Sequence, residues 1–243
     1  MRKKYRLLIL TLLLLLAIGG LPDSCFGQVF FPAYVIGTAA SPVQTPDATN
    51  SGENTSGATL VFTIAPTASN ATVYVATYSY NSGGSNVASI DVKGQTATAI
   101  YQYPTGQDRV ELWCAKGVSS GSGNITITKG NSADEIAAAA LAVLNVNQTT
   151  PNGTQSHNDA TDAAPGVTVT SATGELVVTC VGYYNQALTV NGTGETLRID
   201  NFNSSAQGSI AIITKAGAAS TVFDDDLAGT VHWWMIGVPA KPL

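Results

Sequence analysis

The sequence predicts an all-β fold: a two-sheet antiparallel sandwich of jelly-roll type, built from two sequence-related halves within residues 58–243. Short segments rich in Val, Ile, Thr and Tyr recur there, separated by Gly, Asn, Ser and Asp clusters roughly every 8 to 12 residues. Helical periodicity is almost absent, and ordered sequence matches relate residues 58–146 to residues 165–239. Two tandem immunoglobulin-like sandwiches are the alternative. The second half is short for an independent domain, which favours one compact unit.

The composition excludes several classes of protein. Of the 243 residues, 11% are charged, 44% are apolar and 24 are Gly, a combination unlike that of a charge-rich disordered chain, a coiled coil or a collagen. The net charge is −5 although four basic residues precede position 7, so the rest of the chain is more acidic still. Because an acidic surface repels phosphate backbones, no nucleic-acid partner is expected.

Residues 1–27 are predicted to be a secretory signal peptide. A basic start is followed by an apolar stretch at 7–16 and by Gly19-Gly20. The apolar stretch is shorter than the ~20 residues that a spanning helix needs, so contact with the membrane is expected only during export. Cys25 and Gly27 fit a cleavage site, which makes Gln28 the first mature residue. Lipidation of Cys25 is the alternative, although Pro22 stands where such sites usually carry Leu. We therefore expect a secreted protein, located outside the cell or on its surface.

The mature chain begins with an apolar segment and a polar linker, together residues 28–57. The segment could add itself as a strand to a neighbouring copy and so propagate a filament; pairing with its own sheet is the alternative. Pro32 restricts it to a sheet edge in either case. Its candidate assembly residues are Val29, Phe30, Phe31, Tyr34, Val35 and Ile36. Residues 41–57 are polar, with two prolines, and are expected to be a linker.

The first half is expected to contain a succession of strands. They are Ala58–Ala65, Ala71–Tyr80, Val87–Val92, Thr96–Gln102, Arg109–Ala115 and Asn124–Thr128. Lys93-Gly94 predicts a tight hairpin. Glu135–Val146 includes four consecutive Ala residues, which favour a helix, but its place in the repeat favours a strand.

Five sequence matches keep their order in the two halves. Val73–Asn81 resembles Leu176–Asn185, and the later matches are Val92–Gly94 with Val190–Gly192, Thr96–Ile100 with Glu195–Ile199, Ala115–Gly117 with Lys215–Gly217, and Asn124–Thr126 with Ser220–Val222. Each half then closes with a hydrophobic segment after acidic residues. In the last segment, alternation predicts that Trp233 and Met235 face one way and Trp234 and Ile236 the other, as in a strand covered on both faces.

Three cysteines occur, and Cys25 is expected to leave with the leader. Cys114 and Cys180 lie in predicted strands. An oxidising compartment permits a disulfide between them, and two buried thiols are the alternative, because free Cys packs as a small hydrophobic residue.

No catalytic signature is found, and the chain is expected not to be an enzyme. A Ser-His-Asp site would need His157 or His232, the two histidines. Gly117–Gly121 fits GxSxG, but the nucleophile elbow requires a following helix, whereas a strand is predicted there. The segment is therefore interpreted as a hairpin loop. No pair of carboxylates can be placed at the separation that glycoside hydrolysis needs.

No metal or cofactor is expected either. The mature chain lacks cysteine or histidine pairs at zinc-ligand spacing. Asp159 and Asp162 could contribute to a calcium site, but without the EF-hand pattern a solvated loop is the simpler interpretation. Asp224–Asp226 is likewise interpreted as a solvated turn.

Tyrosines supply a hint of ligand binding. Tyr78, Tyr80, Tyr183 and Tyr184 occupy equivalent strand ends in the two halves, and a row of exposed rings there could stack on the faces of sugars. The alternative is that they pack within the sheets, since Tyr is a good strand former. Tyr101 and Tyr103 bracket a predicted loop.

Leu112–Thr128 and His232–Pro242 resemble a class of β-sandwich domains found in bacterial secreted surface proteins and phage virion proteins, which often carry an LW-A strand, a Gly/Ser turn and a closing Trp-containing strand. The resemblance implies an extracellular structural or binding module and transfers no catalytic residue. Our interpretation is therefore a secreted, non-enzymatic structural or adhesive protein whose partner is another copy of itself in an oligomer or filament. The alternative is a carbohydrate-binding module for surface glycans.

Overall fold

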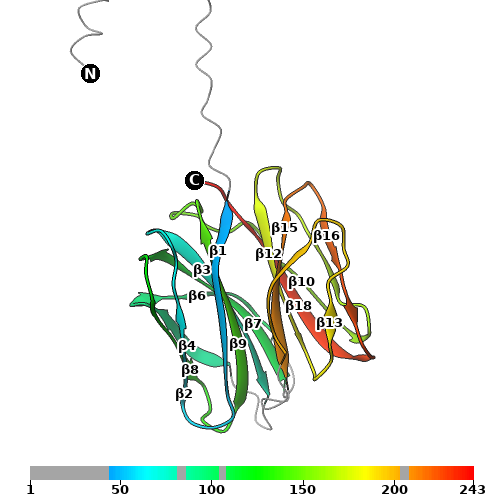
Figure 1. The fold of residues 1–243 in the computed structure, drawn as a ribbon. Helices are drawn as coiled ribbons and strands as arrows, with labels where there is room; N and C mark the ends of the chain where they lie inside the picture. The colour runs from blue at the N-terminus through cyan, green and yellow to red at the C-terminus, as the bar shows by residue number, and fades with distance from the viewer. Residues whose placement is uncertain (1–43, 81–85, 104–107, 203–207) are drawn as a thin grey trace, which may run out of the picture. The chain divides into compact units, whose positions relative to one another are not determined.

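A computed structural model describes residues 44–80, 86–103, 108–202 and 208–243 of the chain (Figure 1). These residues belong to one compact unit, Ser41–Leu243. All regular elements of the described residues are β-strands, and all their pairings are antiparallel. The predicted all-β fold in two halves is confirmed.

The first half, residues 45–144, contains two sheets. We call the five-stranded one, with the order β1-β9-β3-β7-β6, the first central sheet; the other has the order β2-β8-β4-β5. The strands are β1 (Thr45–Asn54), β2 (Thr59–Ile64), β3 (Ala71–Tyr80), β4 (Val87–Val92), β5 (Gln95–Thr96), β6 (Thr98–Gln102), β7 (Asp108–Val118), β8 (Gly123–Lys129) and β9 (Glu135–Leu144).

The second half, residues 156–240, repeats the five-stranded arrangement. Its five-stranded sheet, here the second central sheet, has the order β10-β18-β12-β15-β14, and two-stranded sheets are formed by β11-β16 and β13-β17. The strands are β10 (Ser156–Asp162), β11 (Gly166–Val169), β12 (Leu176–Tyr183), β13 (Leu188–Thr189), β14 (Thr196–Asn201), β15 (Ser209–Ala216), β16 (Thr221–Asp224), β17 (Asp226–Leu227) and β18 (Val231–Ala240).

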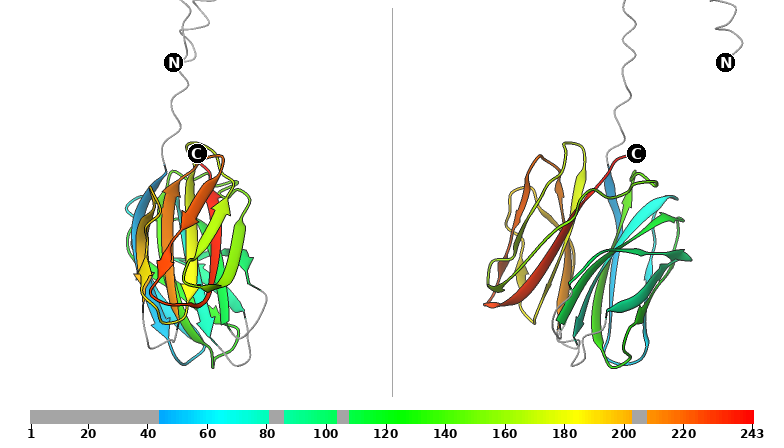
Figure 2. Two further views of the ribbon diagram at one scale, coloured as in Figure 1. Left: turned by 90° about the vertical axis from the view of Figure 1, so that its right-hand side faces the viewer. Right: turned by 180° about the vertical axis from the view of Figure 1, so that it is seen from behind.

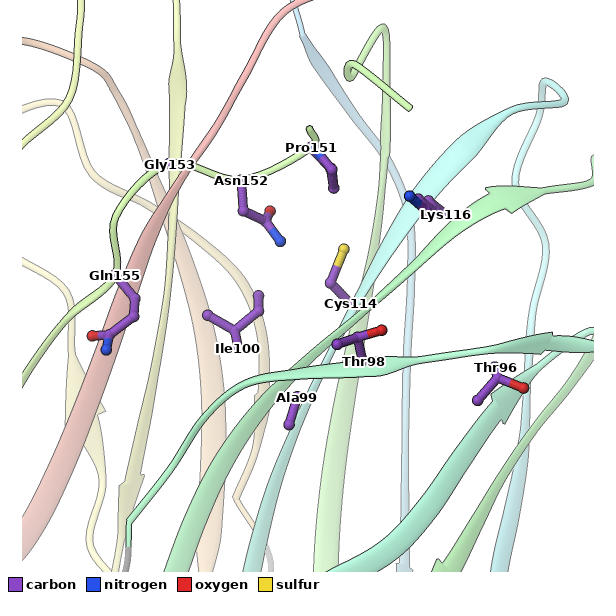
Figure 3. A pocket seen from close by; sticks show the side chains of 10 residues that line it. All are labelled: Thr96, Thr98, Ala99, Ile100, Cys114, Lys116, Pro151, Asn152, Gly153 and Gln155. Atoms are coloured by element: carbon purple, nitrogen blue, oxygen red, sulfur yellow. The ribbon is translucent and has the colours of Figure 1, made fainter. Parts of the chain in front are cut away.

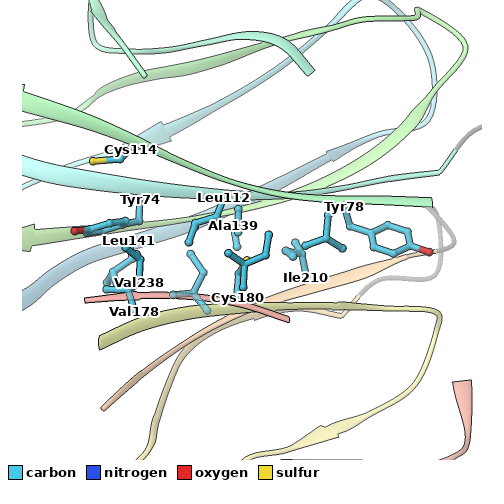
Figure 4. Packing of buried hydrophobic residues seen from close by; sticks show 14 of the residues in the cluster. Tyr74, Tyr78, Leu112, Cys114, Ala139, Leu141, Val178, Cys180, Ile210 and Val238 are labelled. Atoms are coloured by element: carbon cyan, nitrogen blue, oxygen red, sulfur yellow. The ribbon is translucent and has the colours of Figure 1, made fainter. Parts of the chain in front are cut away.

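Both central sheets are buried on both faces, because alternate side chains of their strands belong to different hydrophobic clusters. On β3, Val75 packs in the core of the first half, whereas Tyr74 packs in a cluster shared by the two halves. On β12, Cys180 joins this shared cluster and Val181 packs in the core of the second half. Figure 4 shows the shared cluster between strands of the two halves, and Figure 2 shows the halves side by side.

The described strands form five sheets, whereas two were expected. The difference has a physical reason. Each half encloses a core of its own, and the third cluster forms where the two central sheets meet. The outer face of each central sheet is therefore covered by further strands instead of solvent.

Gly182 and Gly208, both in the second half, allow the two central sheets to approach closely. A Cβ atom on Gly182 would lie 2.3 Å from Cγ2 of Val110, and one on Gly208 would lie 1.9 Å from Cε1 of Tyr78. Both distances are shorter than any real carbon contact. Glycine is therefore required at these two positions by packing.

The prediction of a strand at Glu135–Val146 is confirmed by β9. Ala137 and Ala139 pack in the shared cluster, while Ala138 and Ala140 pack in the core of the first half. The strand lies between β1 and β3, so both of its edges are paired. Burial on two faces and two ladders of backbone hydrogen bonds thus outweigh the helix propensity of alanine.

The expectation of a linker at 41–57 is wrong, because β1 occupies Thr45–Asn54 and pairs with β9. Its side chains are mostly half-buried, since β1 is an edge strand of the first central sheet. A polar sequence suits such a strand, because an edge exposes one row of backbone groups to water.

Two local predictions are confirmed. Lys93 and Gly94 have φ angles of 55° and 82°, as a tight turn between β4 and β5 requires. On β18, Trp233 and Met235 pack in the core of the second half, whereas Trp234 and Ile236 pack in the shared cluster. The closing strand is therefore covered on both faces over this part of its length.

Candidate functional site

A pocket of about 360 Å³ opens where the edge of the first central sheet meets the segment that joins the two halves (Figure 3). We call it the seam pocket. Ile100 and Thr98 on β6 and Cys114 on β7 form one wall, and Asn152 and Gln155 from the joining segment form the other. The lining thus combines apolar side chains with hydroxyl and amide groups, as ligand pockets commonly do.

Cys114 lines the seam pocket and is 6% exposed. Burial raises the pKa of its thiol to about 11, against a smaller lowering effect of a hydrogen bond with Asn152 and of the charge of Lys116. A thiol that stays protonated at neutral pH is a poor nucleophile. Cys114 therefore supplies packing surface at this wall and no activated sulfur.

An aromatic cluster of Tyr101, Tyr103 and His157 adjoins the seam pocket. The rings of Tyr101 and His157 are stacked with centroids 4.0 Å apart and an angle of 16° between their planes. Tyr103 meets both rings edge-on, at 5.2 Å and 5.6 Å. The cluster is connected to the pocket through Gln155, whose Oε1 lies 3.3 Å from His157 Nδ1. Because His157 is exposed, the cluster presents an aromatic surface to solvent.

A β-bulge in β6 explains how this cluster forms. The register of β6 against β7 shifts between Ala99 and Tyr101. In a regular strand the neighbours Ile100 and Tyr101 would face opposite sides, but a bulge redirects a side chain. Both residues pack against the shared cluster of the two halves. The bulge therefore places the Tyr101 ring at the junction of the halves, beside Ile100 of the pocket wall.

His157 and His232, the histidines that a Ser-His-Asp site would require, do not converge on one site. On the ladder between β10 and β18, His157 pairs with Ile236, whereas His232 pairs with Thr161. His232 lies 3.3 Å from Asp159 and 3.1 Å from the Thr161 hydroxyl, and its ring stacks on Trp234. The side chains of His232 and Asp159 are 44% and 46% exposed, so the pair lies on the surface and contributes little to stability.

The GxSxG segment begins in the last two residues of β7 and continues into the loop before β8. Because β7 and β8 belong to different sheets, this loop crosses between sheets, and its interpretation as a hairpin loop is wrong. Lys93 Nζ donates hydrogen bonds to the carbonyl oxygens of Ser119 and Ser120, at 2.9 Å and 2.8 Å, and to that of Gly121. The loop carbonyls converge on this ammonium group. The next element is a strand, where a nucleophile elbow would have a helix.

Asp162 has a structural role. It accepts hydrogen bonds from the Trp233 indole at 2.7 Å and from the backbone N–H of Ala164 at 2.8 Å, and these two bonds lower the pKa of Asp162. Among the described residues, no group of three or more His, Cys, Asp or Glu side chains could hold a metal ion.

The prediction of a solvated turn at Asp224–Asp226 is wrong for its middle residue. Asp224 and Asp226 are exposed, but Asp225 is fully buried. Burial, then the hydrogen bond and charge of Glu195, and then the neighbouring carboxylates raise the pKa of Asp225 to about 8. Glu195 in turn lies 3.3 Å from Lys215 Nζ. The strand alternation of β16 and β17 turns Asp225 inward between two outward carboxylates.

The four tyrosines proposed as a stacking row do not form one. Tyr78 and Tyr183 are fully buried, Tyr80 is half-buried and Tyr184 is 42% exposed. Tyr78 packs in the shared cluster, and Tyr183 packs in the core of the second half. The strands β3 and β12, which carry Tyr78, Tyr80 and Tyr183, are covered on two faces, which removes the exposed face that a row requires; Tyr184 follows the end of β12. The aromatic cluster was missed because neither the bulge nor the approach of His157 has a sequence signal.

Cys114 and Cys180 are both free and buried in this structure. They belong to the same shared cluster but are not joined (Figure 4). Burial raises the pKa of Cys180 to about 12. Of the two alternatives, the structure has the pair of buried thiols.

The predicted signal peptide, residues 1–27, and the proposed assembly segment Val29–Ile36 lie outside the described residues. In the part of the chain that is described, no helix is long and apolar enough to cross a membrane.

No protein-family model matches the chain, and neither a curated protein nor a solved structure matches it significantly. The resemblance to secreted and virion sandwich domains therefore stays a prediction.

Proposed function

We propose that this chain is a secreted, non-enzymatic adhesive protein that binds carbohydrate at the junction of its two halves. The observation that carries the proposal is the aromatic cluster beside the seam pocket, which is exposed to solvent at His157. Tyr101 and His157 form a stacked pair, and Gln155 connects this pair to a pocket of about 360 Å³.

The chemistry of the two parts suits a sugar. A pyranose ring has an apolar face of C–H groups that packs on an aromatic ring, and hydroxyl groups around its edge that need hydrogen-bond partners. The exposed face of His157 and the Tyr101 edge supply the aromatic surface, while Asn152, Gln155 and Thr98 supply amide and hydroxyl groups. Amides both donate and accept, which matches the dual character of a sugar hydroxyl.

We also propose that the fold is a pair of β-sandwiches that arose by duplication. The strand order β9-β3-β7-β6 of the first central sheet corresponds to β18-β12-β15-β14 in the second. The five sequence matches relate β3 to β12 and β7 to β15 in this same order. On this view the sugar site lies where the two copies meet.

Carbohydrate binding is tested with the mature protein on a glycan array, followed by calorimetric titration of the best glycan. Tyr101→Ala and His157→Ala should each weaken binding about five- to tenfold, as expected for loss of one aromatic contact worth about 1 kcal/mol. Tyr101→Phe should bind as wild type does. Tyr184→Ala, which removes an exposed ring elsewhere, is the control. Retention of no glycan, or equal affinities for Tyr101→Ala and wild type, would refute the proposal.

Self-assembly through Val29–Ile36 is the second candidate. An added strand needs an open sheet edge, and within the described residues β1, β6, β10 and β14 each have one neighbour in their sheet. Electron microscopy of the mature protein and of a variant lacking residues 28–37 tests this proposal. Filaments in the first sample and none in the second would support it, and identical samples would refute it.

A further inference from the structure

We propose that the seam pocket selects an acidic sugar, whose carboxylate is bound by Lys116. This inference rests on the proposed carbohydrate binding and adds the chemical class of the ligand. Lys116 is the one charged side chain that lines the pocket; the remaining polar groups there are hydroxyls and amides.

Lys116 lies near the end of β7, where the register of the ladder with β3 shifts. Leu112 and Cys114 pack in the shared cluster of the two halves, and Lys116, two residues further, lines the seam pocket together with Cys114. Lys116 is exposed, whereas Cys114 is buried. The aliphatic chain of Lys116 can therefore cover the wall of the pocket while the ammonium group stays in water.

Lys116 has no side-chain hydrogen bond or ion pair within the described residues, unlike Lys93, Lys129 and Lys215. Lys93 is bound by loop carbonyls and Lys215 by Glu195, while Lys129 Nζ donates to the carbonyl oxygen of Asp134. The chain as a whole is acidic, with a net charge of −5. An unpaired cation in a pocket of an acidic protein attracts an anion, and an ammonium–carboxylate hydrogen bond is about twice as strong as a neutral one.

The remaining wall fits the rest of a uronate. Ile100 and Ala99 offer apolar surface to the C–H face of the ring, and Asn152 and Gln155 stand on the opposite side for its hydroxyls (Figure 3). A volume of about 360 Å³ is at the small end of ligand pockets, which favours one sugar residue. The residue could be a free uronate or the end of an acidic polysaccharide, since both carry the same carboxylate.

The experiment compares glucuronate with glucose, and an oligoglucuronate with its methyl ester, by NMR titration of the mature protein. Wild type should bind each acid at least tenfold more tightly than its neutral counterpart. Lys116→Gln should abolish the preference by weakening the binding of the acid, while Lys116→Arg should keep most of the preference. Lys241→Gln makes the same charge change outside the seam pocket and should leave the preference intact.

Each other outcome has a defined meaning. Equal binding of acid and neutral sugar by wild type overturns the inference and leaves the proposed function standing. Equal losses in Lys116→Gln and Lys241→Gln also overturn it, because they would reflect the overall charge of the protein. Binding of neither sugar to any variant overturns the inference together with the proposed function. Tighter binding of the oligomer than of free glucuronate identifies the polysaccharide as the source, and equal binding identifies the free acid.

Discussion

The hydroxyl of Tyr74, which is completely buried on β3, donates a 2.8 Å hydrogen bond to Oδ1 of Asn152 in the segment joining the halves. Asn152 also contacts the Cys114 thiol and lines the seam pocket. The shared cluster and the pocket wall are thereby connected through one side chain. A change in the core at Tyr74 should therefore be detectable at the candidate site.

Tyr74→Phe should lower the free energy of unfolding by about 1 to 2 kcal/mol, because it removes the hydroxyl and leaves Asn152 Oδ1 without this donor. The corresponding fall in Tm is about 2 to 8 °C for a domain of this size. Thermal unfolding followed by circular dichroism measures it. Tyr80→Phe, at the half-buried end of the same strand, is the control and should change Tm little. An unchanged Tm for Tyr74→Phe would show that the hydrogen bond does not contribute.

The two thiols should react with iodoacetamide in a fixed order. At pH 8 both are mainly protonated, since burial raises the pKa of Cys114 to about 11 and that of Cys180 to about 12. Cys114 lines a pocket and is 6% exposed, whereas Cys180 is fully buried. Slow labelling of Cys114 in the native protein and labelling of Cys180 only after denaturation are expected. Peptide mapping without reductant measures both, and failure of either thiol to react in denaturant would reveal a disulfide.

Gly182→Ala should destabilise the protein by about 1 to 3 kcal/mol, the usual cost of an overpacked core. The new methyl group would lie 2.3 Å from Val110 Cγ2, across the contact between the two central sheets. In a Val110→Ala background the same substitution should cost less, because the conflict with Val110 Cγ2 is gone and the 2.9 Å approach to Tyr78 Cδ2 remains. Urea unfolding of wild type, the two single variants and the double variant gives the coupling free energy between the two positions. Strictly additive effects would contradict the contact.

The strands were predictable where the two-residue alternation of apolar side chains and the residues typical of tight turns indicate the same boundaries. The predicted ranges Ala71–Tyr80 and Val87–Val92 coincide with β3 and β4, and the turn at Lys93-Gly94 lies where the sequence places it. The strand at Thr45–Asn54 was not predictable, because its polar side chains carry no alternation and only its pairing with β9 makes it a strand.

The candidate site depends on contacts that sequence does not encode locally. Tyr78 and Tyr101 are both tyrosines near strand ends, yet Tyr78 is buried in the shared cluster and Tyr101 joins an exposed aromatic group. The difference arises from the bulge in β6 and from the approach of His157, 56 positions away in the sequence. Neither is visible before the halves are brought together.

Asp225 should make the stability of the protein fall as the pH rises. Its pKa is raised from 3.8 to about 8 in the folded protein, so between these pH values the native state holds a proton that the unfolded chain has released. The stability associated with this proton is fully present below about pH 4 and is lost as the pH increases toward 8. Asp225→Asn removes the ionisable group and should flatten this dependence. At pH 8 the variant should be more stable than wild type, by at most about 6 kcal/mol, since the pKa shift is about 4 units and each unit corresponds to about 1.4 kcal/mol.

Urea unfolding at pH 5 and at pH 8 measures the effect. Asp224→Asn is the matched control, because it makes the same change at an exposed neighbour. Its gain at pH 8 should be smaller, arising only from the loss of one like charge beside Asp225. If Asp225→Asn and wild type lose the same free energy of unfolding between pH 5 and pH 8, the Asp225 carboxyl is already ionised in the folded protein.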